Sequence, residues 1–105
     1  MSSHPPILGP QIEWIRLKEA LAYTGRSDRT LRSWCRDYGI GRQSSKGAPI
    51  EISLPALELV MAGDFEALEY LRAGNRSHPR VLRVLLYLGL ADLPPERGPV
   101  SPVLP

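Results

Sequence analysis

The stretch from residue 17 to residue 38 places the tightest constraint on the fold of this 105-residue chain. Its apolar residues fall at helical spacing in two successive segments. Gly25 ends the first segment and Gly39 ends the second, as glycine commonly does after a helix. Ser27 or Asp28 can cap the second helix, because their side-chain oxygens accept from free N–H groups in its first turn. The sequence therefore predicts two short helices joined by a tight turn.

The second of these helices has two chemically different faces. Its anchoring face comprises Leu31, Trp34, Cys35 and Tyr38. Its opposite face, called the arginine face below, comprises Arg29, Arg32, Ser33 and Arg36. Arginine pairs bidentately with guanine O6 and N7 or holds phosphates through its planar fork. A helix that anchors by one face and offers arginines on the other is suited to a DNA major groove.

Charge is distributed unevenly along the chain, although the net charge is only +2. Residues 16–46 hold eight basic and three acidic side chains, a net charge of +5. Residues 47–75 hold one basic and five acidic side chains, a net charge of −4, and residues 76–105 carry +2. A basic segment that coincides with helical phase is expected of a protein with a polyanion partner. The alternative is a solvated surface with scattered arginines.

The composition also limits the class of protein. A chain of this length allows one small domain, and it has no apolar run long enough to span a membrane. The first ten residues lack the features of a signal peptide, so we expect a cytoplasmic, nucleoid-associated location. The lone Cys35 predicts a buried structural thiol, and His4 and His78 have no neighbouring ligands for a metal. No nucleophile–base arrangement or phosphate-binding glycine loop is visible, so neither an enzyme nor a cofactor is expected.

A short two-stranded hairpin is expected after the helix pair. Residues 50–52 alternate apolar and polar side chains, as a half-buried strand does, and residues 44–47 supply turn chemistry. Pro49 is compatible with an edge strand. Around the tip of this hairpin stand Arg42, Gln43 and Lys46. A disordered loop is the alternative.

Three further helices are predicted towards the C-terminus. Ser53, followed by an early proline, opens the third helix, and the fourth turns Phe65, Leu68 and Leu71 inward. The fifth, from Arg80 to Leu90, is nearly encircled by apolar residues and so requires burial on more than one side. The predicted organisation is a flexible arm (1–12), a single domain (13–90) and a proline-rich disordered tail (91–105).

The stretch from Trp14 to Asp64 resembles the winged helix-turn-helix domain of the MerR-like superfamily. That group includes the small excisionases of phages and other mobile genetic elements, also called recombination directionality factors. The most specific matching pattern is Gly-x-Ser-x-x-Thr-Leu-Arg, here from Gly25 to Arg32. Further matches are Trp14-Ile15, Leu17 to Leu21, Thr24 to Ser27, Arg29 to Trp34 and Gly39-Ile40. The resemblance implies a mainly α, winged helix-turn-helix fold with additional C-terminal helices, its second helix entering the major groove and its wing reaching a minor groove or the backbone.

Two departures from the larger MerR-type regulators shape the functional expectation. Those regulators carry aromatic and arginine residues in the second wing strand, where this chain has Ile50-Glu51-Ile52, and they carry a dimerising coiled coil and an effector domain. The resemblance then favours a small excisionase that binds attachment-site DNA cooperatively, bends it and directs an integrase towards excision. Head-to-tail self-association is expected, with the acidic third and fourth helices and the apolar fifth helix of one copy against a basic face of the next. For the fifth helix, the alternative is that it only closes the core of the monomer. The alternative is a small MerR-like transcriptional regulator.

The expected DNA contacts come from the turn between the two helices, from the first turn and the arginine face of the second helix, and from the hairpin. They are Arg26, Ser27, Arg29, Thr30, Arg32, Ser33, Arg36, Arg42, Gln43 and Lys46. At least two of the four residues of the arginine face should touch DNA. An alternative for Arg32 is an ion pair with Asp28, four residues earlier on the same helix.

Overall fold

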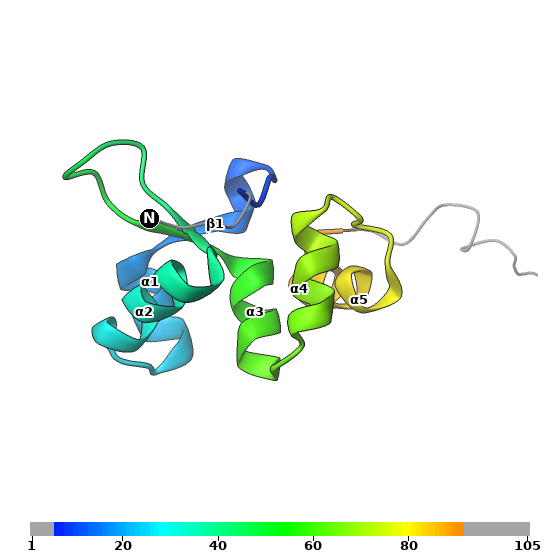
Figure 1. Ribbon diagram of the computed structural model, residues 1–105. Coiled ribbons are helices and arrows are strands. Elements are labelled where there is room, and N and C mark those ends of the chain that lie inside the picture. Colours follow the sequence, from blue (N-terminus) through cyan, green and yellow to red (C-terminus); the bar gives the residue numbers. More distant parts are fainter. Residues whose placement is uncertain (1–5, 92–105) are drawn as a thin grey trace, which may run out of the picture.

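Helices dominate the computed structural model, which describes residues 6–91, and a small antiparallel sheet accompanies them (Figure 1). The elements of this range are the 3-10 helix η1 (Gln11–Glu13), β1 (Trp14–Arg16), α1 (Leu17–Thr24), α2 (Asp28–Tyr38), β2 (Gly41–Arg42), β3 (Glu51–Ser53), α3 (Leu54–Ala62), α4 (Phe65–Arg72) and α5 (Pro79–Tyr87). In Figure 1, α1, α2 and the sheet occupy one half of the molecule, and α4 and α5 lie at the opposite end, beyond α3. The mainly α prediction is confirmed at this level.

The predicted helix pair is present, with the predicted ends. Gly25 follows α1 and Gly39 follows α2, both in the left-handed region (φ 70° and 65°), which glycine adopts without the steric cost of a Cβ. Ser27 caps α2, and its Oγ accepts a hydrogen bond from the backbone N–H of Thr30 at 3.1 Å. Local chemistry therefore determines at which residues α2 begins and ends.

The sheet has three strands in the order β1–β3–β2, so the two strands expected after the helix pair, β2 and β3, are present and a third strand joins them. β1 pairs antiparallel with β3, with Ile15 opposite Ile52, and this pairing makes β3 the central strand. Pro49 consequently marks no edge strand, because it precedes β3 and its missing N–H removes no hydrogen bond of the ladder. The pairing of β1 escaped the sequence reasoning because it joins segments far apart in the chain, which a local alternation pattern does not reveal.

One cluster of buried apolar side chains extends through both halves of the described residues. Leu31 of α2, Ile52 of β3, Leu57 of α3 and Leu68 of α4 all belong to it. Burial of such side chains is the main favourable term in folding, at about 1.5–3 kcal/mol for each one fully removed from water. The helix pair and the C-terminal helices are therefore stabilised by the same core.

In the N-terminal segment the side chain of Ile7 is buried in this core, with 5% exposed, whereas those of Leu8 and Ile12 are exposed. Residues 11–13 form η1, and the buried Glu13 makes an ion pair with Arg76. The flexible arm expected over residues 1–12 stays a prediction, and the structure describes residues 6–12 of it. Residues 1–5 and 92–105, which include almost all of the predicted tail, lie outside the described residues.

Two expectations about the C-terminal helices were wrong. Phe65 is 44% exposed rather than inward, because it stands at the first position of α4. Its ring packs against the ring of Tyr38 instead of entering the core. α5 ends at Tyr87 and buries fully only Val81 and Leu85, so it is covered on one side rather than several. Within residues 6–91 no helix, α5 included, has the length and apolar character needed to cross a membrane.

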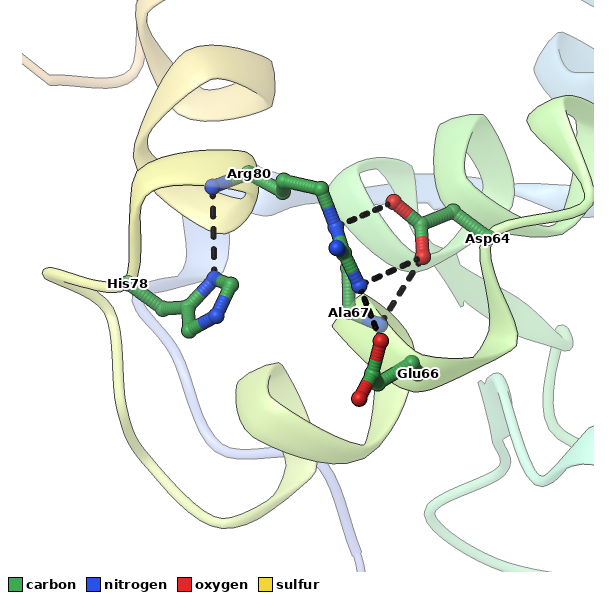
Figure 2. A network of polar contacts seen from close by, with 5 residues as sticks. All are labelled: Asp64, Glu66, Ala67, His78 and Arg80. Carbon is green, nitrogen blue, oxygen red and sulfur yellow. Dashed lines mark hydrogen bonds and ion pairs between the residues drawn. The ribbon is translucent and has the colours of Figure 1, made fainter.

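A polar network joins the start of α4 to the start of α5 (Figure 2). Asp64 caps α4 by accepting from the N–H of Ala67 at 3.1 Å, and the same carboxylate lies 2.9 Å from Nε of Arg80. Glu66 contacts the same guanidinium at 2.7 Å. His78 caps α5, its Nδ1 accepting from the N–H of Arg80. A single arginine from α5 thus pairs with two carboxylates of the acidic segment.

Candidate nucleic-acid interface

The anchoring face of α2 packs as predicted. Leu31 is fully buried, and Trp34, Cys35 and Tyr38 pack half-buried against the core. On the opposite side the three arginines of the arginine face are exposed, and Ser33 is half-buried. One face of α2 therefore holds the helix to the protein while the other presents basic side chains to solvent.

Acidic neighbours on α2 partly neutralise the arginine face. Nε of Arg32 lies 2.6 Å from Oδ1 of Asp28, so the i, i+4 ion pair considered as an alternative is present. Nε of Arg36 lies 3.4 Å from Oδ1 of Asp37, and 70% of the Arg36 side chain is exposed. Arg29 makes no ion pair or hydrogen bond within residues 6–91. Exposed ion pairs of this kind contribute little stability, so they exchange readily for an external anion.

The predicted contact residues at the start of α2 also make contacts within the protein. Ser27 donates from its hydroxyl to Oγ1 of Thr30 at 3.0 Å, in addition to its capping role. The guanidinium of Arg26 lies 5.5 Å from the ring centre of Trp34, in cation–π geometry. All three polar residues stay near the N-terminal end of α2, where backbone N–H groups and the helix dipole favour anions.

Two of the three predicted hairpin contacts are engaged within the protein. Arg42 donates to Glu51 at 2.9 Å and to Gln11 at 2.6 Å, and its guanidinium lies 4.0 Å from the ring centre of Trp14. The hydrogen bond from Arg42 lowers the pKa of the Glu51 carboxyl. Gln43 donates to the carbonyl of Ala48 at 2.6 Å and so braces the loop between β2 and β3.

Lys46 differs from these two hairpin residues. It is exposed near the tip of the loop between β2 and β3, and it makes no ion pair or hydrogen bond within the described residues. In Figure 1 this loop extends away from the helices. Of the three hairpin positions predicted to touch DNA, Lys46 is therefore the one whose charge is unengaged.

A groove of about 440 Å³ separates α2 from β2 and the loop that follows. It is lined by Arg32, Cys35, Arg36, Gly41, Arg42, Gln43 and Ile50. A Cβ on Gly41 would lie 2.5 Å from Sγ of Cys35, so only glycine lets β2 approach α2 this closely. The arginine face and the hairpin thus border one basic depression.

The chemistry of this groove is basic rather than nucleophilic. Burial raises the pKa of the Cys35 thiol to about 11, against a smaller opposing effect of Arg32, so the thiol is protonated at neutral pH. No group of three or more His, Cys, Asp or Glu side chains within residues 6–91 is arranged to hold a metal ion. His78 stacks on Tyr70 with ring centres 4.0 Å apart and caps α5.

Arginines partly neutralise the acidic segment in three dimensions, which its sequence did not reveal. Besides the network around Arg80 (Figure 2), Glu51 pairs with Arg42 and Glu69 lies 3.4 Å from Arg72. The acidic face expected on α3 and α4 is therefore largely occupied by arginines of the same chain.

A buried arginine on α4 is a further residue that the sequence analysis missed. The side chain of Arg72 is only 3% exposed and donates to the carbonyl oxygens of Tyr38 and Gly39, at 2.6 and 3.4 Å. No local pattern identifies it, because an arginine at the end of a helix usually faces water.

Comparison with known proteins adds no relative to this description. No protein-family model, no curated protein and no solved structure matches the chain. The functional inference therefore rests on the arginine face of α2 and on the residues that surround it.

Proposed function

We propose that this protein binds double-stranded DNA as a winged helix-turn-helix module, with α2 as the helix that enters the major groove. The observation that carries the proposal is the arginine face: Arg29, Arg32 and Arg36 are exposed along one side of a helix whose other side is buried. An α-helix such as the 11-residue α2 is about 10–12 Å in diameter with its side chains, and a B-DNA major groove about 12 Å wide accommodates it.

The arginines divide between two kinds of contact in this proposal. Arg29, which has no partner in the described residues, is the strongest candidate for contact with a base edge. Arg32 and Arg36 exchange Asp28 and Asp37 for DNA phosphates or guanines, since their ion pairs are exposed. Thr30 and Ser33 are positioned for uncharged hydrogen bonds, and Arg26 for a phosphate near the start of α2.

The hairpin then contributes one contact and a support. Lys46 reaches the phosphate backbone from the loop between β2 and β3. Arg42 and Gln43 hold that loop in place through Glu51 and Ala48 rather than touching DNA themselves. This changes the expected contact set, in which all three hairpin residues met the DNA.

The salt dependence of binding is the sharpest test of this function. Five unengaged or weakly paired cations (Arg26, Arg29, Arg32, Arg36 and Lys46) predict a slope of about −4.5 for log affinity against log salt. Fluorescence anisotropy with a labelled duplex of about 30 base pairs measures it. Arg29→Met should weaken binding about tenfold or more if Arg29 contacts a base. A flat salt response would overturn DNA binding.

Arg83 supplies a matched control for this experiment. It lies on α5, is exposed and makes no ion pair or hydrogen bond within residues 6–91, so Arg83→Met removes the same charge far from α2. Binding by Arg83→Met should stay within about twofold of the unmodified protein. Equal losses from both variants would show that only net charge matters and that α2 is not the reading element.

For the biological role we propose the excisionase type that the resemblance implies. In that role several copies fill neighbouring sites, bend attachment-site DNA and direct an integrase towards excision. Because the acidic residues of α4 are already paired, cooperativity is better ascribed to DNA shape than to an acidic–basic contact between copies. A reconstituted excision reaction tests the role. Footprints on a promoter with no effect on excision would instead support a small transcriptional regulator.

A further inference from the structure

Arg72 is buried where a charged side chain is costly unless its hydrogen bonds are satisfied. It belongs to α4, yet its guanidinium donates to Tyr38 and Gly39, the last residue of α2 and its C-cap. The final carbonyls of a helix have no partner within the helix, and a cation there also interacts favourably with the helix dipole. Arg72 therefore completes the C-terminal end of α2 from a different part of the chain.

A second contact between α2 and α4 also involves Tyr38. The ring of Phe65, at the start of α4, packs against the ring of Tyr38 with centres 5.0 Å apart and an interplanar angle of 38°. Phe65 and Arg72 are seven residues apart, which is two helical turns, so they share one face of α4. Two contacts from one face fix the direction of α2 as well as the place of its C-terminal end.

We infer that Arg72 is a positioning residue for DNA recognition: it sets the angle at which α2 leaves the protein, without touching DNA itself. The inference rests on the proposed function and adds a task for α4. The side chain of Arg72 is only 3% exposed, so its guanidinium is not accessible to a DNA phosphate. Loss of its hydrogen bonds leaves α2 anchored by Leu31 and by its cap, but free to tilt at its C-terminal end.

The test compares DNA binding and folding in four proteins. Arg72→Met removes both hydrogen bonds and the charge, while Arg72→Lys keeps a charge that can reach one carbonyl. Phe65→Leu removes the ring contact alone, and Arg83→Met is the charge-matched control. Affinity and its salt slope are measured by anisotropy at a temperature at which circular dichroism shows each variant folded.

Expected results separate positioning from contact and from folding. Arg72→Met should weaken binding about tenfold with an unchanged salt slope, since the number of phosphate contacts is the same. Arg72→Lys and Phe65→Leu should fall between Arg72→Met and the control. If Arg72→Met does not fold, the other two variants carry the comparison.

Several outcomes would overturn the inference. Folded Arg72→Lys and Phe65→Leu proteins that bind with unchanged affinity would remove the positioning role. A salt slope reduced by about one in Arg72→Met would make Arg72 a direct phosphate contact. If the unmodified protein binds no duplex, the proposed DNA binding is overturned, whatever the Arg72 variants show. Backbone amide shifts then report the orientation of α2, and unchanged shifts at its last turn in Arg72→Lys would overturn the positioning claim as well.

Discussion

The arginines of α2 and two arginines of the C-terminal helices make different kinds of contact. In the helix-pair region (β1 to β3), the arginines of α2 pair only with acidic neighbours on their own helix and remain exposed. In the C-terminal region (α3 to α5), Arg72 and Arg80 reach across to other elements and satisfy buried or capping groups (Figure 2). Arginine is thus a surface charge on α2, whereas Arg72 and Arg80, like Arg42 in the helix-pair region, connect different elements of the fold.

This difference shows why charge along a sequence is a poor guide to charge on a surface. The segment 47–75 carries a net −4, but arginines from before and after it in the chain neutralise much of that charge. The basic segment keeps more of its charge available, because the only carboxylates on α2 belong to Asp28 and Asp37. The polarity of the molecule therefore comes from unpaired cations more than from an opposing acidic face.

The largest expected effect tests whether the two regions share one core. Leu31→Ala in α2 and Leu71→Ala in α4 should each lower the free energy of unfolding by about 2–5 kcal/mol. Both tryptophans, Trp14 and Trp34, lie in the helix-pair region, so their fluorescence reports that region alone. Urea transitions followed by fluorescence and by circular dichroism should coincide in both variants. Separate transitions would divide the protein into two units.

A second comparison sets Arg42 against Lys46 within the hairpin. Arg42→Met removes a cation–π contact with Trp14, worth about 0.5–1 kcal/mol, together with its hydrogen bonds, so the thermal midpoint should fall. Lys46→Met should leave the midpoint unchanged and reduce the size of the salt slope by about one. Scanning calorimetry and anisotropy check the two effects. A reversed pattern would make Arg42 the DNA contact.

Acidic residues should also behave differently in the two regions. Asp28→Asn releases Arg32 and removes a carboxylate near the DNA, so affinity should rise about two- to fivefold at low salt. Asp64→Asn changes the network beneath α4 and α5 and should leave affinity unchanged, although Asp64→Ala should cost about 1 kcal/mol of stability as a lost cap. Tighter DNA binding by Asp64→Asn would mean that the acidic segment does face the DNA.

The smallest effect concerns Cys35, because burial raises the pKa of its thiol from the ordinary value of 9.0 to about 11 in the folded protein. Between these values the unfolded chain loses the proton while the folded protein keeps it, so stability should fall as pH rises from 9 to 11. Urea midpoints for the unmodified protein should drop over this range more than those for Cys35→Ala. A thiol that reacts rapidly at pH 7 would contradict its burial.

Sequence reasoning succeeded where the determining chemistry is local. Gly25, Ser27 and Gly39 act on the turns beside them, so the ends of α2 and its two faces were predictable. It failed where distant segments meet. The pairing of β1 with β3 needs residues 15 and 52 to come together, and no periodicity within either segment predicts this pairing.

The candidate site divides along the same line. Exposure of Arg29 and Arg36 follows from helical phase, and the Asp28–Arg32 pair follows from their spacing. The engagement of Arg42 with Gln11 and Trp14 depends on the fold, since those partners come from η1 and β1. The same holds for Arg72, whose partners lie more than thirty residues earlier in the chain.

Ser53 is the last residue of β3 and also the N-cap of α3. Its Oγ accepts a hydrogen bond from the backbone N–H of Ala56 in α3. Its own N–H donates to Ile40 at 2.9 Å, and it stands opposite Trp14 in the sheet. No residue separates the strand from the helix, so there is no linker about which the two halves could hinge. Under the proposed function, the protein would consequently meet DNA without a hinge between its two halves, and the bending proposed for the complex would fall on the DNA.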